Sequence, residues 1–226
     1  MSGVPTLQGP QRKLKVPIII NEYAWLWLTR EGEPTCLTTE VYRHLVGDGA
    51  TPNQRREVYA RYLAAKTEFW RAHRECAGVL HFCTLGYSRP GDRPRPEGGA
   101  TSDHWIDLDQ LKLEPNFEKY VRDAFNPVGL MLNFWAEQTS DCGLQSVQAW
   151  VINDLEPAWK GTIRLRLERE GKNLSESSQR CTVEGFGREI LEFPVVIPQE
   201  HGTYRLIAEL DGKGQHTRSV REFKVP

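Results

Sequence analysis

The chain has 226 residues, of which 39% are hydrophobic and 26% are charged, as in one large or two ordinary globular domains. This composition excludes a disordered chain, and a net charge of −1 offers no attraction to nucleic acid or to an anionic membrane. No apolar segment approaches the ~20 residues of a membrane span, and residues 1–15 lack the apolar core of a signal peptide. The five cysteines show no ligand spacing, so we expect free thiols and neither a metal nor a cofactor.

The first predicted strand is Val16–Ile20, in which four of five residues are Val or Ile. A run without polar alternation is typical of a parallel strand buried on both faces. Glu22 follows where such a strand opens onto the C-terminal face of its sheet, the usual place for chemistry. A solvated Glu22, or one paired with Arg30, is the alternative. Tyr23, Trp25 and Trp27 come next and could form a platform for a flat apolar ligand face.

Two helices are predicted after this strand. The first lies around Thr39–Leu45 and ends at Gly47. The second begins with Thr51 as N-cap, Pro52 at the first position and Gln54 completing a capping box, and it runs to about Arg74. Its apolar residues recur at helical spacing and are expected to face a sheet: Val58, Tyr59, Tyr62, Phe69 and Trp70.

A second buried strand is predicted at Gly78–Cys83, followed by a long loop from Thr84 to about Leu111. A loop of this length in a compact domain indicates a functional segment over a site. Its polar and aromatic side chains could contact a sugar, or they could belong to a solvated lid whose aromatics pack down: Tyr87, Arg89, Asp103, His104 and Trp105.

The last helix of the first part begins near Pro115, and its apolar stripe consists of Phe117, Tyr120, Val121 and Ala124. After Pro127 the hydrophobic period changes to two, which places a domain boundary between residues 1–125 and 126–226. Seven short strands separated by turn signals predict an immunoglobulin-like β-sandwich. They lie near Val128–Trp135, Ser146–Ile152, Thr162–Glu168, Gln179–Val183, Ile190–Ile197, Tyr204–Leu210 and Ser219–Val225.

Two strand–helix units cannot close a parallel sheet, and an eightfold barrel needs about 250 residues. Two buried strands without neighbours would leave apolar faces and sheet edges open to water. We therefore expect the chain to be α/β plus all-β: the last two βα units of a TIM (β/α)8 barrel followed by an immunoglobulin-like sandwich. The exposed half-barrel predicts that the chain associates with other chains. A truncated N-terminus would have lost any signal peptide, so the cellular compartment is left open.

Three segments in this order resemble the C-terminal part of family 2 glycoside hydrolases, the β-galactosidase, β-glucuronidase and β-mannosidase type. Ile20–Tyr23 is similar to the strand-seven segment that ends in the nucleophile, in a Glu-Tyr or Glu-Phe context. Phe117–Val128 is similar to the final helix that leads into Ala-x-x-Pro-Val, and Val151–Asp154 to the Val-x-Asn-Asp turn of the following sandwich.

The resemblance implies a retaining β-glycosidase in which Glu22 is the nucleophile. The acid/base of this family follows an Asn on strand four, which lies upstream of this chain. The implied partners are a carbohydrate substrate and the missing N-terminal part of the same protein. The Trp that this family usually has near strand eight is absent, so the sequence does not identify the sugar. Candidate substrate contacts are Asn21, Tyr23, Trp25, His81, Tyr87, Asp103, His104 and Trp105. The alternative function is a non-catalytic carbohydrate-binding or structural module.

Overall fold

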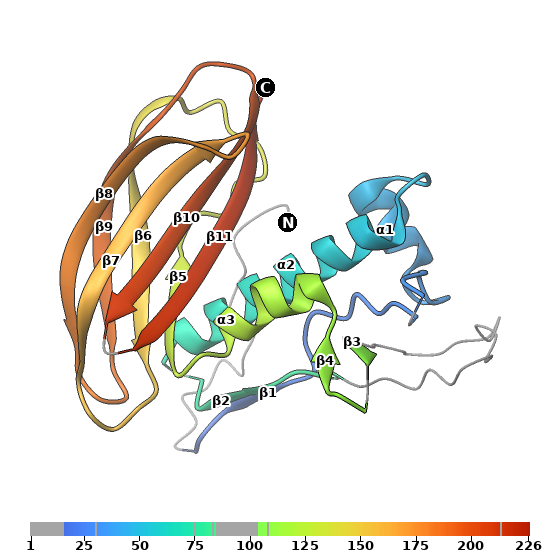
Figure 1. Ribbon diagram of the computed structural model, residues 1–226, viewed down its shortest axis with the longest axis horizontal. Helices are drawn as coiled ribbons and strands as arrows, with labels where there is room; N and C mark the ends of the chain where they lie inside the picture. The colour runs from blue at the N-terminus through green and yellow to red at the C-terminus, as the bar shows by residue number, and fades with distance from the viewer. Residues whose placement is uncertain are drawn as a thin grey trace.

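The computed structural model describes residues 16–29, 31–74, 76–82, 84, 104–107, 109–212 and 214–226. A long helix crosses the molecule, with a small parallel sheet on one side and a β-sandwich on the other (Figure 1). The first part contains β1 (Ile19–Asn21), α1 (Thr39–Val46), α2 (Pro52–Ala72), β2 (Gly78–Leu80), β3 (Trp105–Asp107), β4 (Lys112–Leu113), the π-helical turn η1 (Phe117–Val121) and α3 (Arg122–Ala124). The sandwich contains β5 (Val128–Leu132), β6 (Gly143–Asn153), β7 (Trp159–Arg169), β8 (Lys172–Val183), β9 (Arg188–Ile197), β10 (Gly202–Gly212) and β11 (Gln215–Val225).

Strands β1 and β2 are parallel neighbours, with Ile20 opposite Val79. The prediction that the first strand is buried on both faces is wrong, since 56% of Ile19 and 57% of Leu80 are exposed. The physical reason is that β1 has a single neighbour among the described strands. The Glu22 N–H donates to the Leu80 carbonyl at 2.9 Å, toward β2. Because main-chain groups alternate along a strand, those of Ile19 face the opposite edge, where no described strand lies.

Helix α2 begins with the predicted capping box. The Thr51 hydroxyl accepts a hydrogen bond from the Gln54 N–H, and the Gln54 side-chain oxygen accepts one from the Thr51 N–H. Pro52 occupies the first helical position, where its missing N–H costs nothing. Both predicted helices are confirmed, although α2 ends at Ala72 rather than at Arg74.

The predicted last helix forms as η1 and α3, and its whole apolar stripe from Phe117 to Ala124 is buried against α2 and the start of the chain. The long loop predicted between Thr84 and Leu111 lies mostly outside the described residues. Its end is more regular than expected, because Trp105–Asp107 pairs with Lys112–Leu113 in a short antiparallel hairpin.

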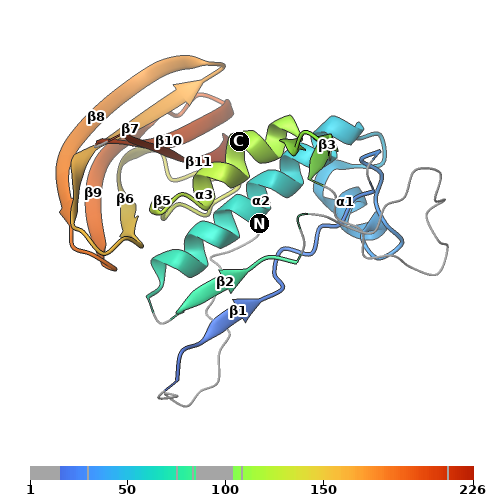
Figure 2. The ribbon, with the colours of Figure 1, turned by 60° about the horizontal axis from the view of Figure 1, so that its bottom comes forward.

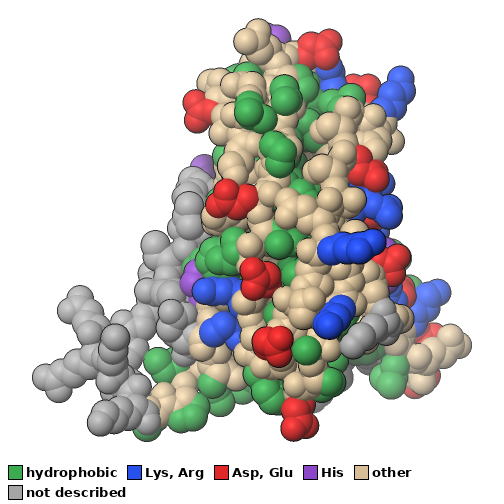
Figure 3. Space-filling view, turned by 90° about the vertical axis from the view of Figure 1, so that its left-hand side faces the viewer, with side chains coloured by type: hydrophobic (Ala, Val, Ile, Leu, Met, Phe, Trp, Pro, Cys, Tyr) green, Lys and Arg blue, Asp and Glu red, His purple; other side chains and the backbone are tan. Residues whose placement is uncertain are grey.

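All seven predicted sandwich strands are present. They form one sheet in the order β5-β6-β9 and a second in the order β11-β10-β7-β8, and apolar side chains of both fill the space between them. The fourth strand, β8, pairs with β7, whereas the antibody constant-type arrangement pairs the fourth strand with the fifth. On the side of the molecule formed by β8 and β9, acidic, basic and apolar side chains are interspersed (Figure 3).

Helix α2 packs on the outer face of the β5-β6-β9 sheet (Figure 2). Phe69 of the helix packs with Met131 of β5 and Ile152 of β6, and all three side chains are buried. This contact explains why Met131 and Ile152 are buried on a face that would otherwise be solvated.

A buried ion pair joins α2 to the last strand of the sandwich. Glu68, of which 2% is exposed, accepts hydrogen bonds at 2.7 Å from Arg221 Nη2 and from the Ser219 hydroxyl. The Arg221 guanidinium also lies over the Trp135 ring, 4.6 Å from its centroid. These two charges have left water, so their mutual attraction, their hydrogen bonds and the Trp135 ring must stabilise them.

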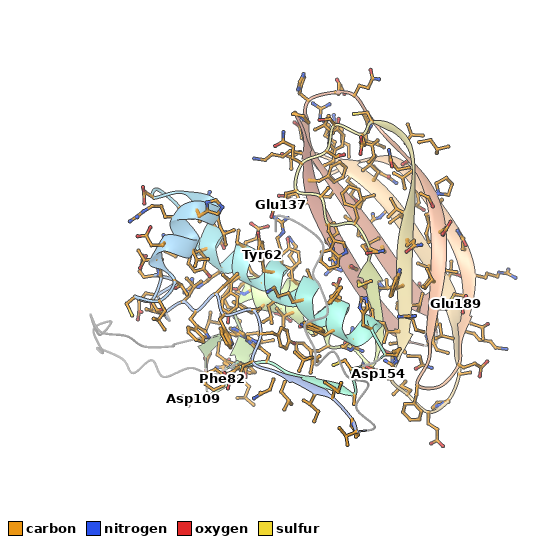
Figure 4. All side chains as sticks on the ribbon, turned by 180° about the vertical axis from the view of Figure 1, so that it is seen from behind. Tyr62, Phe82, Asp109, Glu137, Asp154 and Glu189 are labelled. Carbon is orange, nitrogen blue, oxygen red and sulfur yellow. The ribbon has the colours of Figure 1, made fainter. Side chains whose placement is uncertain are left out.

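A second ionic contact lies at the C-terminal end of α2. Arg71 and Arg74 both pair with Asp154, at 2.9 and 2.6 Å (Figure 4). The preceding Asn153 is fully buried, and its side-chain amide donates to three carbonyls of the sandwich, which fixes the turn that presents Asp154. The contacts of Glu68 and of Arg71 therefore hold α2 to the sandwich at two places along the helix, and the Arg61–Glu222 ion pair adds to them nearer its start.

Replacing Glu68 with Ala should lower the free energy of unfolding by about 3–5 kcal/mol, because Arg221 is left buried without its counter-charge. Glu118→Ala is the matched control, since its ion pair with Arg122 is exposed and its loss should cost less than about 1 kcal/mol. Urea unfolding followed by tryptophan fluorescence measures both. Equal, small losses in the two variants would contradict a structural role for the buried pair.

Candidate active site at the end of the parallel sheet

Glu22 stands directly after β1, and its side chain is exposed at the carboxyl end of the parallel sheet. Its backbone has φ of 61°, and that of Ala24 is 57°. Left-handed backbone is uncommon for residues other than glycine, and it costs free energy that the surrounding structure must supply. Among the described residues, no hydrogen bond or ion pair engages the Glu22 carboxylate, so it is available to a ligand.

Tyr23 anchors this segment to α2. Its phenol lies 2.7 Å from the Thr67 hydroxyl, which itself donates to the Leu63 carbonyl at 2.8 Å. Since Thr67 has one hydroxyl proton and uses it there, Tyr23 is the donor. Burial raises the pKa of Tyr23 to about 12, so the phenol stays neutral and is not positioned to act as a base.

His81 holds the same segment from the β2 side. Its Nδ1 lies 3.2 Å from the Tyr23 carbonyl, which can only accept, so the proton is on Nδ1. Burial lowers the pKa of His81 to about 4, which leaves the ring neutral at pH 7. Its Nε2 is buried and has no hydrogen-bond partner within the described part of the chain. Tyr23 is therefore held by Thr67 through its phenol and by His81 through its carbonyl, which fixes the backbone immediately after Glu22.

His104 belongs to a stack of rings beneath the site. It is 1% exposed and lies between His81, at 5.3 Å and 9°, and Phe117, at 3.8 Å and 16°. Tyr59 of α2 meets His81, His104 and Phe117 edge-on. Burial lowers the pKa of His104 well below its usual 6.5, with His81 acting in the same direction. In this chain His104 therefore packs as a core side chain, and a contact with sugar stays a prediction.

Two of the expected substrate contacts lie on the surface. Asn21 is exposed at the end of β1, and Trp25 is exposed three residues after Glu22. Trp105 begins β3 and is half-buried. Tyr87 and Asp103 lie outside the described residues.

The structure brings together Asn21, Glu22, Tyr23 and His81, which come from the ends of the two parallel strands. Sequence reasoning missed Thr67, which receives the Tyr23 hydrogen bond, and treated Tyr59 only as a core residue. A polar Thr67 on the sheet-facing side of an amphipathic helix was the available signal.

No group of three or more His, Cys, Asp or Glu side chains in the described ranges is arranged to hold a metal ion. None of the helices in those ranges has the length and the apolar composition of a membrane span.

A groove of about 60 Å³ lies between α2 and the sandwich, and the Tyr62 hydroxyl donates a hydrogen bond to Glu137 there at 2.9 Å (Figure 4). It is far smaller than the ~300–1,000 Å³ of ordinary ligand sites and includes no residue of β1 or β2.

No family model matches this sequence, and no curated protein is similar to it. Among solved structures, the β-D-mannosidase of Dictyoglomus thermophilum has a similar fold, with a TM-score of 0.57 and 15% identity. The match covers 83% of this chain and 22% of that one. The fold resembles that of a glycoside hydrolase. Because the sandwich alone is less than half of the chain, the match extends beyond the sandwich into residues 1–125.

Two further structures are similar at lower scores. A β-glucuronidase from glycoside hydrolase family 2 has a TM-score of 0.32 and 6% identity, over 43% of this chain and 11% of that one. Red sea bream transglutaminase has a TM-score of 0.37 and 12% identity, over 51% and 20%. Because both TM-scores are below 0.5, neither structure supports an argument about this chain. The chain spans about a fifth of the length of the mannosidase structure.

The two neutral histidines predict a pH dependence of stability. The folded-state pKa of His81, about 4, lies below the unfolded value of 6.5, so the unfolded chain binds a proton that the folded chain does not. The free energy of unfolding should be highest above pH 6.5. As the pH drops toward 4, each histidine should lower it by about 1.4 kcal/mol per pH unit. Urea unfolding at several pH values measures the slope. His81→Gln should remove the contribution of His81 to this slope, about 1.4 kcal/mol per pH unit. His201→Gln, at an exposed site, should leave the slope unchanged.

Proposed function

We propose that the chain is the C-terminal part of a retaining β-glycosidase in which Glu22 is the nucleophile. The observation that carries the proposal is the exposed Glu22 carboxylate at the carboxyl end of a parallel strand pair, held by strained backbone and by its neighbours Tyr23 and His81. The fold likeness to a β-D-mannosidase supports it. Catalytic groups of barrel enzymes lie at this end of the strands.

In this mechanism a Glu22 oxygen attacks the anomeric carbon while the glycosidic C–O bond breaks. A second carboxyl group, about 5–5.5 Å from the first, gives its proton to the departing oxygen. The same group then takes a proton from water, and that water displaces Glu22 from the glycosyl-enzyme intermediate. Asn21 and Trp25 lie close to Glu22 in the chain and are both exposed, and they are the proposed sugar contacts.

The second carboxyl group is proposed to lie on barrel strands outside these 226 residues. No described strand lies at one edge of β1, and the side chains of Ile19 and Leu80 are exposed. Both observations support this proposal, because further strands would pair with that edge and cover these side chains. The sheet would then become the buried element that its sequence predicts. Tyr87, Asp103 and Trp105 are proposed to line the sugar site in that complete barrel, whereas His104 supports the site from the core.

A non-catalytic carbohydrate-binding module is less well supported. Its sandwich would need an exposed aromatic platform, yet the large apolar side chains exposed on the described strands β6 to β9 are aliphatic: Leu144, Leu174, Ile190 and Val196.

In a protein that joins this chain to the missing strands, Glu22→Gln should lower kcat for 4-nitrophenyl β-glycosides by at least about three orders of magnitude. Glu31→Gln is the matched control, since Glu31 is an exposed carboxylate of the following loop, and it should leave kcat unchanged. Normal activity in the Glu22 variant would remove the nucleophile assignment.

The 226-residue chain by itself should not hydrolyse these glycosides, because one carboxylate cannot serve as both nucleophile and acid. Absorbance at the nitrophenolate band with purified chain measures this. Turnover that disappears in Glu22→Gln would show that the chain already holds its second carboxyl group, contrary to the proposal.

A further inference from the structure

Two indole rings lie on the surface immediately after Glu22. Trp25 is 53% exposed, and Trp27 is half-buried and stacked with it, with ring centroids 5.9 Å apart and an angle of 25°. Phe82 is 43% exposed at the end of β2, and its carbonyl accepts a hydrogen bond from Trp27 Nε1 at 3.5 Å. These three residues are named the aromatic ledge. Figure 4 shows Phe82 on the side of α2 away from the sandwich.

The backbone beneath the aromatic ledge is fixed. Leu26 and Leu28 alternate with the two tryptophans and point into the core. The Tyr42 hydroxyl donates to the Leu26 carbonyl at 2.6 Å, and the Thr38 hydroxyl donates to the Trp27 carbonyl at 2.7 Å. The tryptophans therefore face outward because the inward positions are already filled, and a ligand would find the surface ordered in advance.

The size and polarity of this surface identify its occupant. A stable protein partner buries about 800 Å² on each side, more than three side chains provide. Ligand sites combine aromatic walls with a few polar groups, and exposed Asn21 and Glu22 supply an amide and a carboxylate here. A pyranose ring matches this combination, because it has a flat C–H face for the indoles and hydroxyl groups for the polar side chains.

We propose that the aromatic ledge is a carbohydrate subsite that holds the apolar face of a pyranose ring. Trp25 and Glu22 are three residues apart, so their Cα atoms lie within about 11 Å, the length of two linked sugar rings. A disaccharide is therefore long enough to place one unit at Glu22 and the next on the aromatic ledge. This placement, though not the binding itself, rests on the proposed glycosidase function.

The test uses the whole 226-residue chain, labelled with ¹⁵N, and follows the indole N–H signals of its seven tryptophans. Cellobiose and β-1,4-mannobiose are the probes. Titration should shift the signals of Trp25 and Trp27 and leave that of Trp159, inside the sandwich core, in place. Trp25→Ala should weaken binding by about tenfold or more, and Trp25→Tyr, which restores a ring, should recover most of it.

Phe186→Ala is the matched control, because Phe186 is an exposed aromatic residue of the sandwich, and it should leave binding unchanged. Unshifted Trp25 and Trp27 signals at about 50 mM of either disaccharide, well above the millimolar range of weak sites, would overturn the proposal. An unchanged dissociation constant in Trp25→Ala would overturn it as well. Shifts at the aromatic ledge alongside full activity of the Glu22→Gln joined protein would retain the subsite and reject the nucleophile, so the two proposals fail separately.

Discussion

The buried ion pair between Glu68 and Arg221 is the contact on which the rest of this structure depends. The parallel pair β1–β2 is too small to form a core of its own, and it is ordered because Tyr23 and His81 pack against α2. Helix α2 is in turn held to a complete sandwich by Glu68 on one side and by Arg71 with Asp154 at its end. The sandwich thus supports the small parallel pair, with α2 as the element that packs against both.

This arrangement explains how an exposed carboxylate keeps a defined position. Glu22 has few contacts of its own, but the residue after it is buried, hydrogen-bonded to Thr67 and fixed from β2 by His81. The left-handed backbone at Glu22 is thereby maintained without glycine. Because the support comes from α2, residues of this chain are sufficient to hold the site in place.

Local patterns in the sequence predicted much of the fold. The capping box at Thr51, the stripe ending at Ala124 and the seven sandwich strands depend on neighbours close in the chain, and all three are confirmed. Burial of β1 was predicted wrongly, because it requires partner strands that the local pattern implies but the described chain does not contain. The stacking of His104 between His81 and Phe117 joins three distant segments, so no local pattern could reveal it.

The central claim is that Glu22 forms a covalent bond to sugar. The most direct measurement uses a protein that joins this chain to the proposed further strands and treats it with a 2-deoxy-2-fluoro glycosyl fluoride, which slows hydrolysis of the intermediate. Peptide mass spectrometry then locates the label. The claim predicts one fluorosugar on the peptide that contains Glu22, with loss of activity in proportion to labelling. A label on another carboxylate, or loss of activity without a covalent adduct, would contradict it.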